Sequence, residues 1–591
     1  MSKFPDSQRM EKIVSLCKRR GFIFQSSEIY GGLNGAWDYG PLGVELKRNL
    51  KNYWWRVIVH ERDDVVGMDG SILMNRAVWK ASGHEDTFTD PMVDCLVSGK
   101  RFRADQIDEQ SGWVVNFVGA TDFEAFQKLQ QEQEAPERSR IWSEIELGPH
   151  LRRIFTNPSG TFDLNSPSGY VQLSDPVEQT KSLELLIKRG ILGASSLQPF
   201  SAMEIGGDPK SFKWSSRGVN RAIRVAQDFY RKRGVRNPIV FAVGLEREEH
   251  SKRFNPENGS LLTEPRSFNL MFKTFVGATE DESSLTYLRP ETAQAIFVQF
   301  KNILEVSRKK LPFGIAQIGK AFRNEINPRN FTFRSREFEQ MELEYFCRAG
   351  EGMKLLDYWL EERLKFYENI GIAREKLHAR NVPDEERAFY SKGTYDIEYD
   401  FPFGRQELEG VAYRTDYDLS QHQNASGKSL EYFDEETKQR FVPHVVEPSA
   451  GVDRTVLALI CEAYSEDEAP DEKGKMETRL VLRFHPRMAP IKCGIFPLLR
   501  NNAQLIAKAK EIVDLLRPHM NIFYDESGAI GRRYRRQDEI GTPFCVTVDF
   551  ETLGEKDAAL RDTVTLRERD SMKQERVAIN DLAGILISRI S

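Results

Sequence analysis

Four arginines lie close together in residues 321–338, AFRNEINPRNFTFRSREF, among apolar and aromatic side chains. They are Arg323, Arg329, Arg334 and Arg336. The segments 315–325 and 332–346 read as two β-strands, and the Asn- and Pro-containing residues between them read as a turn. We therefore expect a β-hairpin that carries an unusual density of guanidinium groups.

The alternation of side chains along a strand indicates which of these groups act together. Arg323 and Glu325 are expected on one face of the first strand, and Arg334 and Arg336 on one face of the returning strand. Guanidinium groups bind phosphate oxygens and stack on flat rings, so the hairpin is suited to a polyphosphate joined to an aromatic base, such as ATP. A solvated hairpin crossed by salt bridges would show the same pattern.

Acidic side chains occur where two further elements are expected. Glu291 follows Pro290 at the start of a helix that carries apolar residues at helical spacing. By itself it would be explained as a first-turn acid that complements the helix dipole. Glu407 and Glu409 are flanked by apolar residues on a probable strand.

Residues 445–464, VVEPSAGVDRTVLALICEAY, predict a strand, a glycine-containing turn and an apolar helix. Asp453 and Arg454 lie at the start of that helix. A helix N-terminus beside an arginine is a plausible phosphate site.

A long amphipathic helix is expected near the N-terminus, followed by a turn and a strand that begins at Val65. Its apolar residues at helical spacing are Leu42, Leu46, Leu50, Trp54 and Val57. This stripe could pack on the core of its own chain or meet another subunit, and the pattern does not decide between the two.

The composition of the 591 residues, 40% hydrophobic and 29% charged, is that of a folded protein with several domains. No apolar run approaches the roughly 20 residues of a membrane span, and the first residues lack the apolar core of a signal peptide, so we expect a cytoplasmic protein without membrane contact. The six cysteines are widely spaced, which indicates neither a disulfide framework nor a structural zinc site. A net charge of −5 permits only a local basic patch.

The C-terminal residues 488–591 predict a small α/β domain of buried strands and helices. A basic run lies between its strands and contains Arg532, Arg533, Arg535 and Arg536 around Tyr534. Taken alone, such a run is more often a solvated face than a binding site.

Three segments resemble the signature motifs of the class II aminoacyl-tRNA synthetases, in the order of that family. Residues 41–74 resemble motif 1, residues 322–346 motif 2 and residues 447–464 motif 3. The sequences of four segments resemble those of the homodimeric (α2) glycyl-tRNA synthetases, namely YLRPETAQ, RFRAD, FNLMFKTFVG and ELEGVAYRTDYDL. The resemblance implies an α+β fold, in which an antiparallel sheet is flanked by helices, with a C-terminal α/β anticodon-binding domain.

The resemblance also implies four parts of the chain. Residues 1–103 would be the N-terminal part of the catalytic domain with motif 1, and residues 104–265 an insertion. Residues 266–487 would be the catalytic core with motifs 2 and 3, and residues 488–591 the anticodon-binding domain. Within the insertion, residues 126–147 look like an exposed polar arm, and residues 216–234 a helix that is basic on one side.

By resemblance, the arginine hairpin forms part of an ATP site that works by positioning and charge stabilisation. Arg323 would contact the α-phosphate, Glu325 the adenine amino group, and Phe338 would stack on the ring. Arg334 and Arg454 would hold the β- and γ-phosphates, and Arg323, Glu325 and Arg454 would be the catalytic residues. The other expected ATP contacts are Asn324, Phe333, Glu407, Leu408, Gly451 and Asp453. Mg²⁺ is implied as well, with Glu407 and Glu447 as its acidic partners.

Glycine would be recognised in an acidic cage. The resemblance places Glu291, Glu342 and Glu447 around the ammonium group, Ser449 near the α-carbon, and Arg103 and Phe338 within reach of the substrate. A methyl group on the α-carbon would collide with this cage, which would reject alanine. The remaining expected partners are tRNA(Gly), bound through the four C-terminal arginines, and a second copy of the chain.

Two other classes of protein remain open at this point. One is a catalytically silent relative that binds tRNA or a regulatory partner, although every charged residue needed for adenylate formation is present. The other is an ATP-dependent ligase that adenylates a small amine-bearing acid without transfer to tRNA, against which the arginine-rich C-terminal domain argues.

Overall fold

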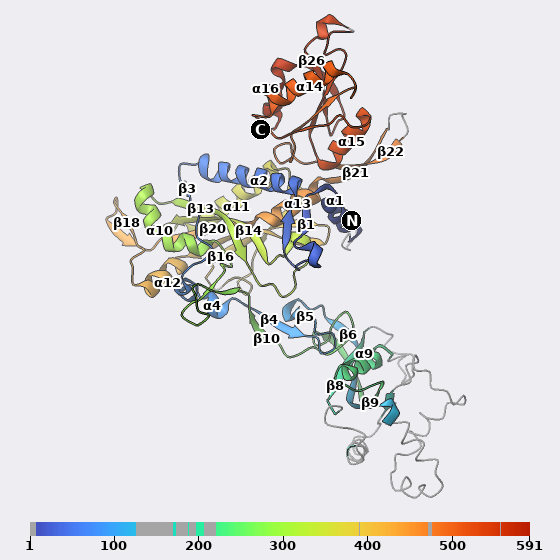
Figure 1. Ribbon diagram of the computed structural model, residues 1–591. Helices are drawn as coiled ribbons and strands as arrows, with labels where there is room; N and C mark the ends of the chain where they lie inside the picture. The colour runs from blue at the N-terminus through green and yellow to red at the C-terminus, as the bar shows by residue number, and fades with distance from the viewer. Residues whose placement is uncertain are drawn as a thin grey trace, which may run out of the picture. The chain divides into compact units, whose positions relative to one another are not determined.

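The computed structural model describes residues 7–125, 170–172, 187, 197–205, 220–388, 390–470, 476–555 and 557–590. The chain forms two compact units, one of Met1–Phe88 with Leu270–Ser591 and one of Thr89–Asn269 (Figure 1). The second unit begins at Thr89, whereas we expected the insertion to begin at residue 104. The polar arm expected at residues 126–147 lies outside the described residues.

A seven-stranded sheet is the centre of the first unit, with strand order β15-β16-β17-β20-β14-β13-β3. Neighbouring strands are antiparallel except for β13 and β3, which are parallel. This antiparallel sheet with flanking helices confirms the α+β fold that we expected. The strands are β3 (Val65–Gly67), β13 (Phe313–Phe322), β14 (Glu337–Cys347), β15 (Leu377–Asn381), β16 (Gly393–Phe401), β17 (Gly404–Thr415) and β20 (His444–Gly451).

Helices cover both faces of this sheet (Figure 1). Along β14, Leu343 and Tyr345 pack into the larger core, whereas Phe346 packs into the smaller core on the other face. Glu342 and Glu344 alternate with Leu343 and therefore point to the face of the smaller core. The larger core includes α1 (Ser7–Arg20), α2 (Pro41–Trp55), α11 (Gly352–Asn369) and α13 (Val452–Ala463), and the smaller core includes α10 (Ala293–Ser307) and α12 (Tyr417–Ser426).

The expected N-terminal helix is α2, which continues as a π-helix, Arg56–His60, toward β3. Leu46, Leu50 and Trp54 are buried in the larger core. Gly43 permits a close approach there, because a Cβ atom at this position would lie 1.8 Å from the main-chain oxygen of Phe22. The apolar stripe therefore packs on its own chain.

The second unit contains two sheets, with strand orders β10-β4-β5 and β7-β9-β6-β8. Helix α9 (Asn220–Arg231), part of the expected basic helix, packs into the core of this unit through Ile223 and Phe229. The strands are β4 (Thr89–Asp94), β5 (Arg101–Arg103), β6 (Gln110–Asp122), β7 (Tyr170–Gln172), β8 (Phe200–Ile205), β9 (Pro238–Ser251) and β10 (Arg266–Asn269).

The C-terminal residues form a five-stranded sheet of order β24-β23-β25-β26-β27. Its first three strands are parallel and its last two pairings are antiparallel. The predicted strands, the helix after the first of them and the closing strand–turn–strand–helix are confirmed, whereas the strand at Ile522–Tyr524 and the helix formed by the basic run at Ile530–Ile540 were not predicted. The elements are β23 (Cys493–Pro497), α14 (Ala503–Leu516), β24 (Ile522–Tyr524), α15 (Ile530–Ile540), β25 (Phe544–Val548), β26 (Thr563–Glu568), β27 (Gln574–Ala578) and α16 (Ile579–Ile590).

Short elements complete the first unit. They are β1 (Ile23–Gln25), β2 (Trp37–Tyr39), α3 (Arg76–Ala81), α4 (His84–Thr87), β11 (Lys273–Phe275), β12 (Leu285–Tyr287), β18 (Tyr432–Asp434), β19 (Gln439–Phe441), β21 (Tyr464–Pro470) and β22 (Met476–Leu482), with 3₁₀-helices at Glu28–Tyr30, Phe331–Phe333, Arg374–Lys376 and Ala558–Leu560. In the part of the chain that the structure describes, no helix is long and apolar enough to cross a membrane.

Candidate active site

A pocket of about 190 Å³ opens where the β13–β14 connection meets β17, β20 and the start of α13. Segments that are far apart in the sequence thus line the same pocket. It is formed by Arg323, Glu325, Thr332, Phe333, Arg334, Ser335, Phe338, Gln340, Glu407, Leu408, Gly410, Ser449, Gly451, Asp453 and Arg454.

Arg323 is held in a defined position at this pocket. Its Nε donates a hydrogen bond to the main-chain oxygen of Pro290 at 3.0 Å. Its guanidinium carbon lies 5.4 Å from the ring centroids of both Phe88 and Phe338. A cation held beside two aromatic rings needs little reorganisation to meet an anionic ligand.

The strands of the hairpin are shorter than we expected. β13 ends at Phe322 and β14 begins at Glu337, so Arg323 and Glu325 lie outside the first strand, and Arg334 and Arg336 outside the returning strand. The physical reason is the connection, where Asn330 and Phe331 both adopt left-handed backbone conformations ahead of a 3₁₀ turn.

The two arginines consequently separate. Arg334 lines the pocket, with its Nη1 3.8 Å from a carboxylate oxygen of Glu325. Arg336 instead donates hydrogen bonds to the main-chain oxygens of Glu325, at 3.0 and 3.2 Å, and Asn34, at 2.8 Å. Arg336 therefore braces the hairpin connection.

Arg454 and Asp453 have different surroundings at the start of α13. The Arg454 guanidinium lies 4.5 Å from the ring centroid of Phe333 and 3.4 Å from a carboxylate oxygen of Glu407. The Asp453 carboxylate accepts hydrogen bonds from Lys47 at 2.8 Å, Tyr39 at 2.6 Å and the main-chain N–H of Glu339 at 2.7 Å. Asp453 thus fixes α13 on α2 and β14 while it lines the pocket.

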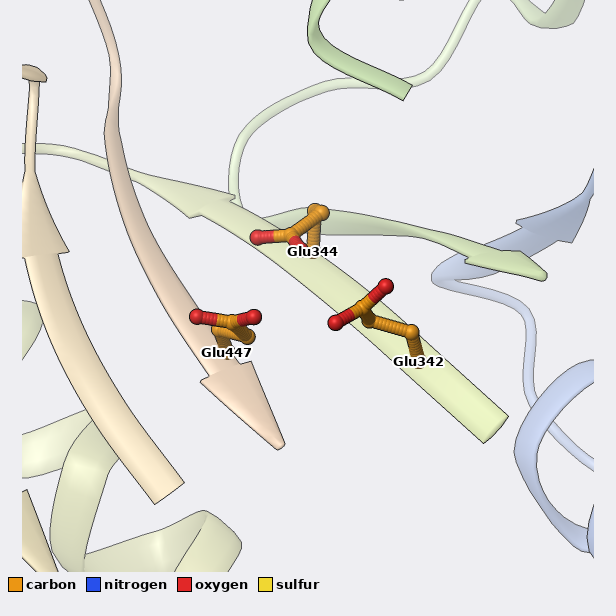
Figure 2. Close-up of side chains that lie close together, drawn as sticks. All are labelled: Glu342, Glu344 and Glu447. Carbon is orange, nitrogen blue, oxygen red and sulfur yellow. The ribbon is translucent and has the colours of Figure 1, made fainter. Parts of the chain in front are cut away.

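Three buried carboxyl groups form a cluster on the α10 face of the sheet (Figure 2). Glu342 and Glu344 come from β14 and Glu447 from β20, and an oxygen atom of each lies within 4.8 Å of the others. Burial raises the pKa of all three groups, and the neighbouring carboxylates raise it further. The cluster is suited to a cation that brings hydrogen-bond donors.

Hydroxyl groups and one arginine partly satisfy this cluster. Glu342 accepts hydrogen bonds from Thr292 and from Ser449, the latter at 2.9 Å. Glu447 accepts one from Arg414 at 2.7 Å, and Arg414 also binds both carboxylate oxygens of Asp418 at 2.8 Å.

Glu291 lies just ahead of α10 and has its own partners. Its carboxylate is 3.4 Å from His84 Nε2 and accepts a hydrogen bond from Gln294 at 3.0 Å. Burial alone would raise the pKa of Glu291, but His84 and Arg414 outweigh it and hold this pKa well below its ordinary value. Glu291 is therefore the ionised acid at this end of the site.

Sequence reasoning did not assign several of these residues. Glu344 could have been found by the strand alternation that places it on the same face as Glu342. Arg414 lies in a segment that we quoted for the resemblance, but no local pattern indicates its ion pairs. The contact of His84 with Glu291 has no signal in the sequence, because a loop and a helix start from distant segments create it.

Arg103 belongs to the second unit. There its guanidinium pairs with Asp90 at 2.9 Å and with Asp105 at 2.8 Å. Its contact with glycine stays a prediction.

Comparison with known proteins assigns the chain to a family. Residues 274–464 match the model of the tRNA synthetase class II core domain (G, H, P, S and T), and residues 492–589 match that of the anticodon binding domain. Similar curated proteins named glycine–tRNA ligase occur in Thermobifida fusca, 42% identical over 99% of both chains, and in Thermus thermophilus, 44% identical over 98% of this chain and 99% of the relative. The chain belongs to the glycine–tRNA ligase family.

A third member of this family, from Streptomyces coelicolor, is 43% identical over 99% of both chains. The segment that matches the class II core model contains the arginine-lined pocket and the acid cluster. The segment that matches the anticodon-binding model contains the C-terminal basic run.

That basic run forms α15, and its four arginines are not equivalent. Arg532 is exposed, whereas Arg533 is buried and donates to the main-chain oxygens of Pro497 at 2.5 Å and Gly528 at 2.7 Å. Arg536 pairs with Asp525 at 2.5 Å, and Arg535 is half-buried. Asp538 and Glu539, which could have paired with the run, bind Arg479, Arg567, Arg19 and Arg20 instead.

This difference predicts opposite effects of two adjacent substitutions. Arg532→Gln is expected to raise the Michaelis constant for tRNA about threefold to tenfold and to lower the salt slope by about 1, because the predicted contact of Arg532 with a tRNA phosphate would be lost. Arg533→Gln is expected to lower the melting temperature, because buried carbonyl groups lose their donor. Aminoacylation at several salt concentrations and thermal melts measure the two effects, and equal behaviour of the variants would contradict the assignment.

Proposed function

We propose that this protein activates glycine with ATP to form glycyl-adenylate and then transfers glycine to the 3′ end of tRNA(Gly). The observation that carries this proposal is the position of Ser449. It lines the arginine pocket, and its hydroxyl donates to Glu342 of the acid cluster. A site for a polyphosphate and a site for a cation thus share one residue, as required when ATP and an amino acid must react.

In the proposed mechanism, the pocket positions ATP and stabilises charge at phosphorus. Arg323 binds the α-phosphate, and its fixed guanidinium offsets the charge that develops when the glycine carboxylate attacks the α-phosphorus and the bond to the β-phosphate breaks, releasing pyrophosphate. Arg334 and Arg454 hold the β- and γ-phosphates. Glu325 accepts a hydrogen bond from the adenine amino group while Phe338 stacks on the base. Phe333, Leu408 and Gly451 line the pocket and complete its shape, while Asn324, whose main-chain N–H binds the Leu270 main-chain oxygen, stays a predicted ATP contact.

The acid cluster selects glycine by its ammonium group. Glu291 is ionised and accepts one N–H, and Glu342 and Glu447 accept others. Ser449 lies beside the α-carbon, where a methyl group would meet the wall of the site. Contact energy alone separates substrates that differ by one methylene by only about 1–3 kcal/mol, so steric exclusion must contribute to the rejection of alanine.

Mg²⁺ would support ATP binding, and the residues present fit it. Glu407 lines the pocket with a side chain that is 50% exposed, 3.4 Å from Arg454, and carboxylate oxygens are preferred ligands of this ion. Glu407 would hold Mg²⁺ from the pocket, whereas Glu447, the second acid that the resemblance implies, lies in the acid cluster and is bound to Arg414. When bound, the ion would neutralise charge on the phosphates.

Glycine-dependent exchange of pyrophosphate into ATP tests the proposal. Run with glycine, alanine and serine, the assay is expected to show exchange with glycine alone. Exchange with another amino acid would refute the substrate assignment. No exchange with any of them would favour a silent relative, and normal exchange without aminoacylation of tRNA(Gly) would favour a ligase of another kind.

We also propose that two copies of the chain form a two-fold dimer, as in the homodimeric relatives that the sequence resembles. The side chains of Leu46, Leu50 and Trp54 are buried in the chain's own core and cannot meet a partner. The interface would therefore use the exposed edge of α2, where Val44 is 40% exposed. Sedimentation at micromolar concentration is expected to give a species of twice the chain mass. A monomer with full activity would contradict this prediction.

The six cysteines are all free and buried. Unpaired thiols are typical of a reducing compartment, which supports a cytoplasmic location. Separation of cell fractions, followed by an assay for the glycine-dependent activity, would test this proposal.

A further inference from the structure

Glu344 stands apart from the other acids of the site because no group in the described part of the chain donates a hydrogen bond to it. It is fully buried on β14, and neither of its carboxylate oxygens has a hydrogen-bond partner. A buried polar group without partners is costly and needs an explanation. The proposed mechanism does not use this residue.

The sheet register directs Glu344 toward the cluster. Glu342 pairs with Ser449 and Tyr345 with Val446, so the antiparallel register sets Glu344 opposite Glu447. On the other side β14 meets β13, where Ile315 is the partner of Glu344 and offers no hydrogen bond from its side chain. Figure 2 shows the three carboxyl groups gathered between the two strands.

The other acids around the site already have protein donors. Glu291 is bound by Gln294 and lies beside His84, Glu342 accepts from two hydroxyl groups, and Glu447 accepts from Arg414. Arg414 divides its charge between Glu447 and Asp418. Glu344 is the acid of this cluster whose hydrogen-bonding capacity is wholly unused.

We propose that Glu344 is a fourth acid of the glycine cage and accepts a hydrogen bond from the substrate's ammonium group at the closed end of the site. This inference rests on the proposed activation of glycine. An ammonium group supplies three donors and a positive charge, which are what a buried carboxyl without partners lacks. Glu344 would then determine affinity for the amino acid and have little influence on ATP.

The test is Glu344→Gln, which keeps the shape and removes the charge. In pyrophosphate exchange, the Michaelis constant for glycine is expected to rise about tenfold to a hundredfold, whereas that for ATP stays within about twofold. The melting temperature of the glycine-free variant is expected to match or exceed that of the wild type, because Glu344 makes no hydrogen bond with the described residues that the substitution could remove and its buried carboxyl can no longer ionise. A residue needed only for folding would lower the melting temperature instead.

Matched variants make the result specific. Glu337→Gln changes an exposed acid of the same strand, which pairs with Lys320, and is expected to leave both Michaelis constants unchanged. Glu344→Met removes the charge with a side chain of similar volume, so it provides a second variant should the glutamine variant fail to fold. It is expected to raise the Michaelis constant for glycine in the same way.

The outcomes separate this inference from the proposed function. A wild type that shows no glycine-dependent exchange refutes the function, and the inference falls with it. A wild type with normal exchange beside a Glu344→Gln variant with an unchanged Michaelis constant for glycine refutes the role of Glu344 alone. Retention of one equivalent of Mn²⁺ or Zn²⁺ after dialysis of the wild type, lost in the variant, would identify a metal site and also overturn the inference.

Discussion

Replacing Arg323 with alanine is expected to reduce glycine-dependent pyrophosphate exchange by about a hundredfold to a thousandfold, which is typical for the loss of one preorganised donor at a reacting centre. The guanidinium group is held by the main-chain oxygen of Pro290 and lies beside two aromatic rings, so the wild type needs little rearrangement before reaction. Because adenylate formation develops charge at phosphorus, the loss should appear mainly in the turnover number. Steady-state exchange at saturating ATP and glycine measures it.

A second arginine of the same connection provides the control. Arg329 is exposed and does not line the pocket in the described structure, so Arg329→Ala is expected to leave exchange within about twofold of the wild type. Circular dichroism should show both variants folded. A folded Arg323→Ala protein with near-normal exchange would remove Arg323 from its proposed role.

Glu342→Gln is expected to raise the Michaelis constant for glycine by about two to four orders of magnitude, because removal of one partner of a buried charged contact costs about 3–5 kcal/mol. Glu342 is oriented by Thr292 and Ser449, and it lies at the junction between the acid cluster and the pocket. Isothermal titration with glycine and exchange kinetics at varied glycine both report the change. The Michaelis constant for ATP should be nearly unaffected.

Glu339 offers a comparison on the opposite face of β14. It pairs with Lys47 at 2.7 Å and Lys51 at 2.9 Å, away from the acid cluster. Glu339→Gln is therefore expected to affect stability more than glycine binding. If Glu342→Gln and Glu339→Gln raised the Michaelis constant for glycine equally, a general destabilisation of β14 would explain the result better than a direct contact.

The arginine pocket and the acid cluster of the proposed substrate site rely on different electrostatic properties. The arginine pocket uses permanent cations that aromatic rings and main-chain carbonyls hold in place, so its charge does not vary with pH near neutrality. The acid cluster uses carboxyl groups whose pKa values burial raises, while Glu291 remains ionised beside His84. One part is set up to receive an anion and the other a cation.

The sequence by itself was sufficient for the elements that carry the site. The strand–turn–helix that contains Arg454, the α2–β3 segment and most elements of the C-terminal domain follow from apolar periodicity and turn residues, whereas β24 and α15 were not predicted. These are local signals, because each depends on residues within a few positions of one another. The family resemblance rests on the same short segments, and the comparisons with known proteins confirm it.

Only the tertiary structure decided which side chains act together. Left-handed residues in the hairpin connection separate Arg334, which lines the pocket, from Arg336, which braces the chain. Folding also buries Arg533 while its neighbour Arg532 stays exposed, although both belong to the same run of arginines. The cluster of Glu342, Glu344 and Glu447 exists because two strands distant in sequence pair in one register, and hydrogen-bond satisfaction in a buried space depends on every group packed there, which no local pattern records.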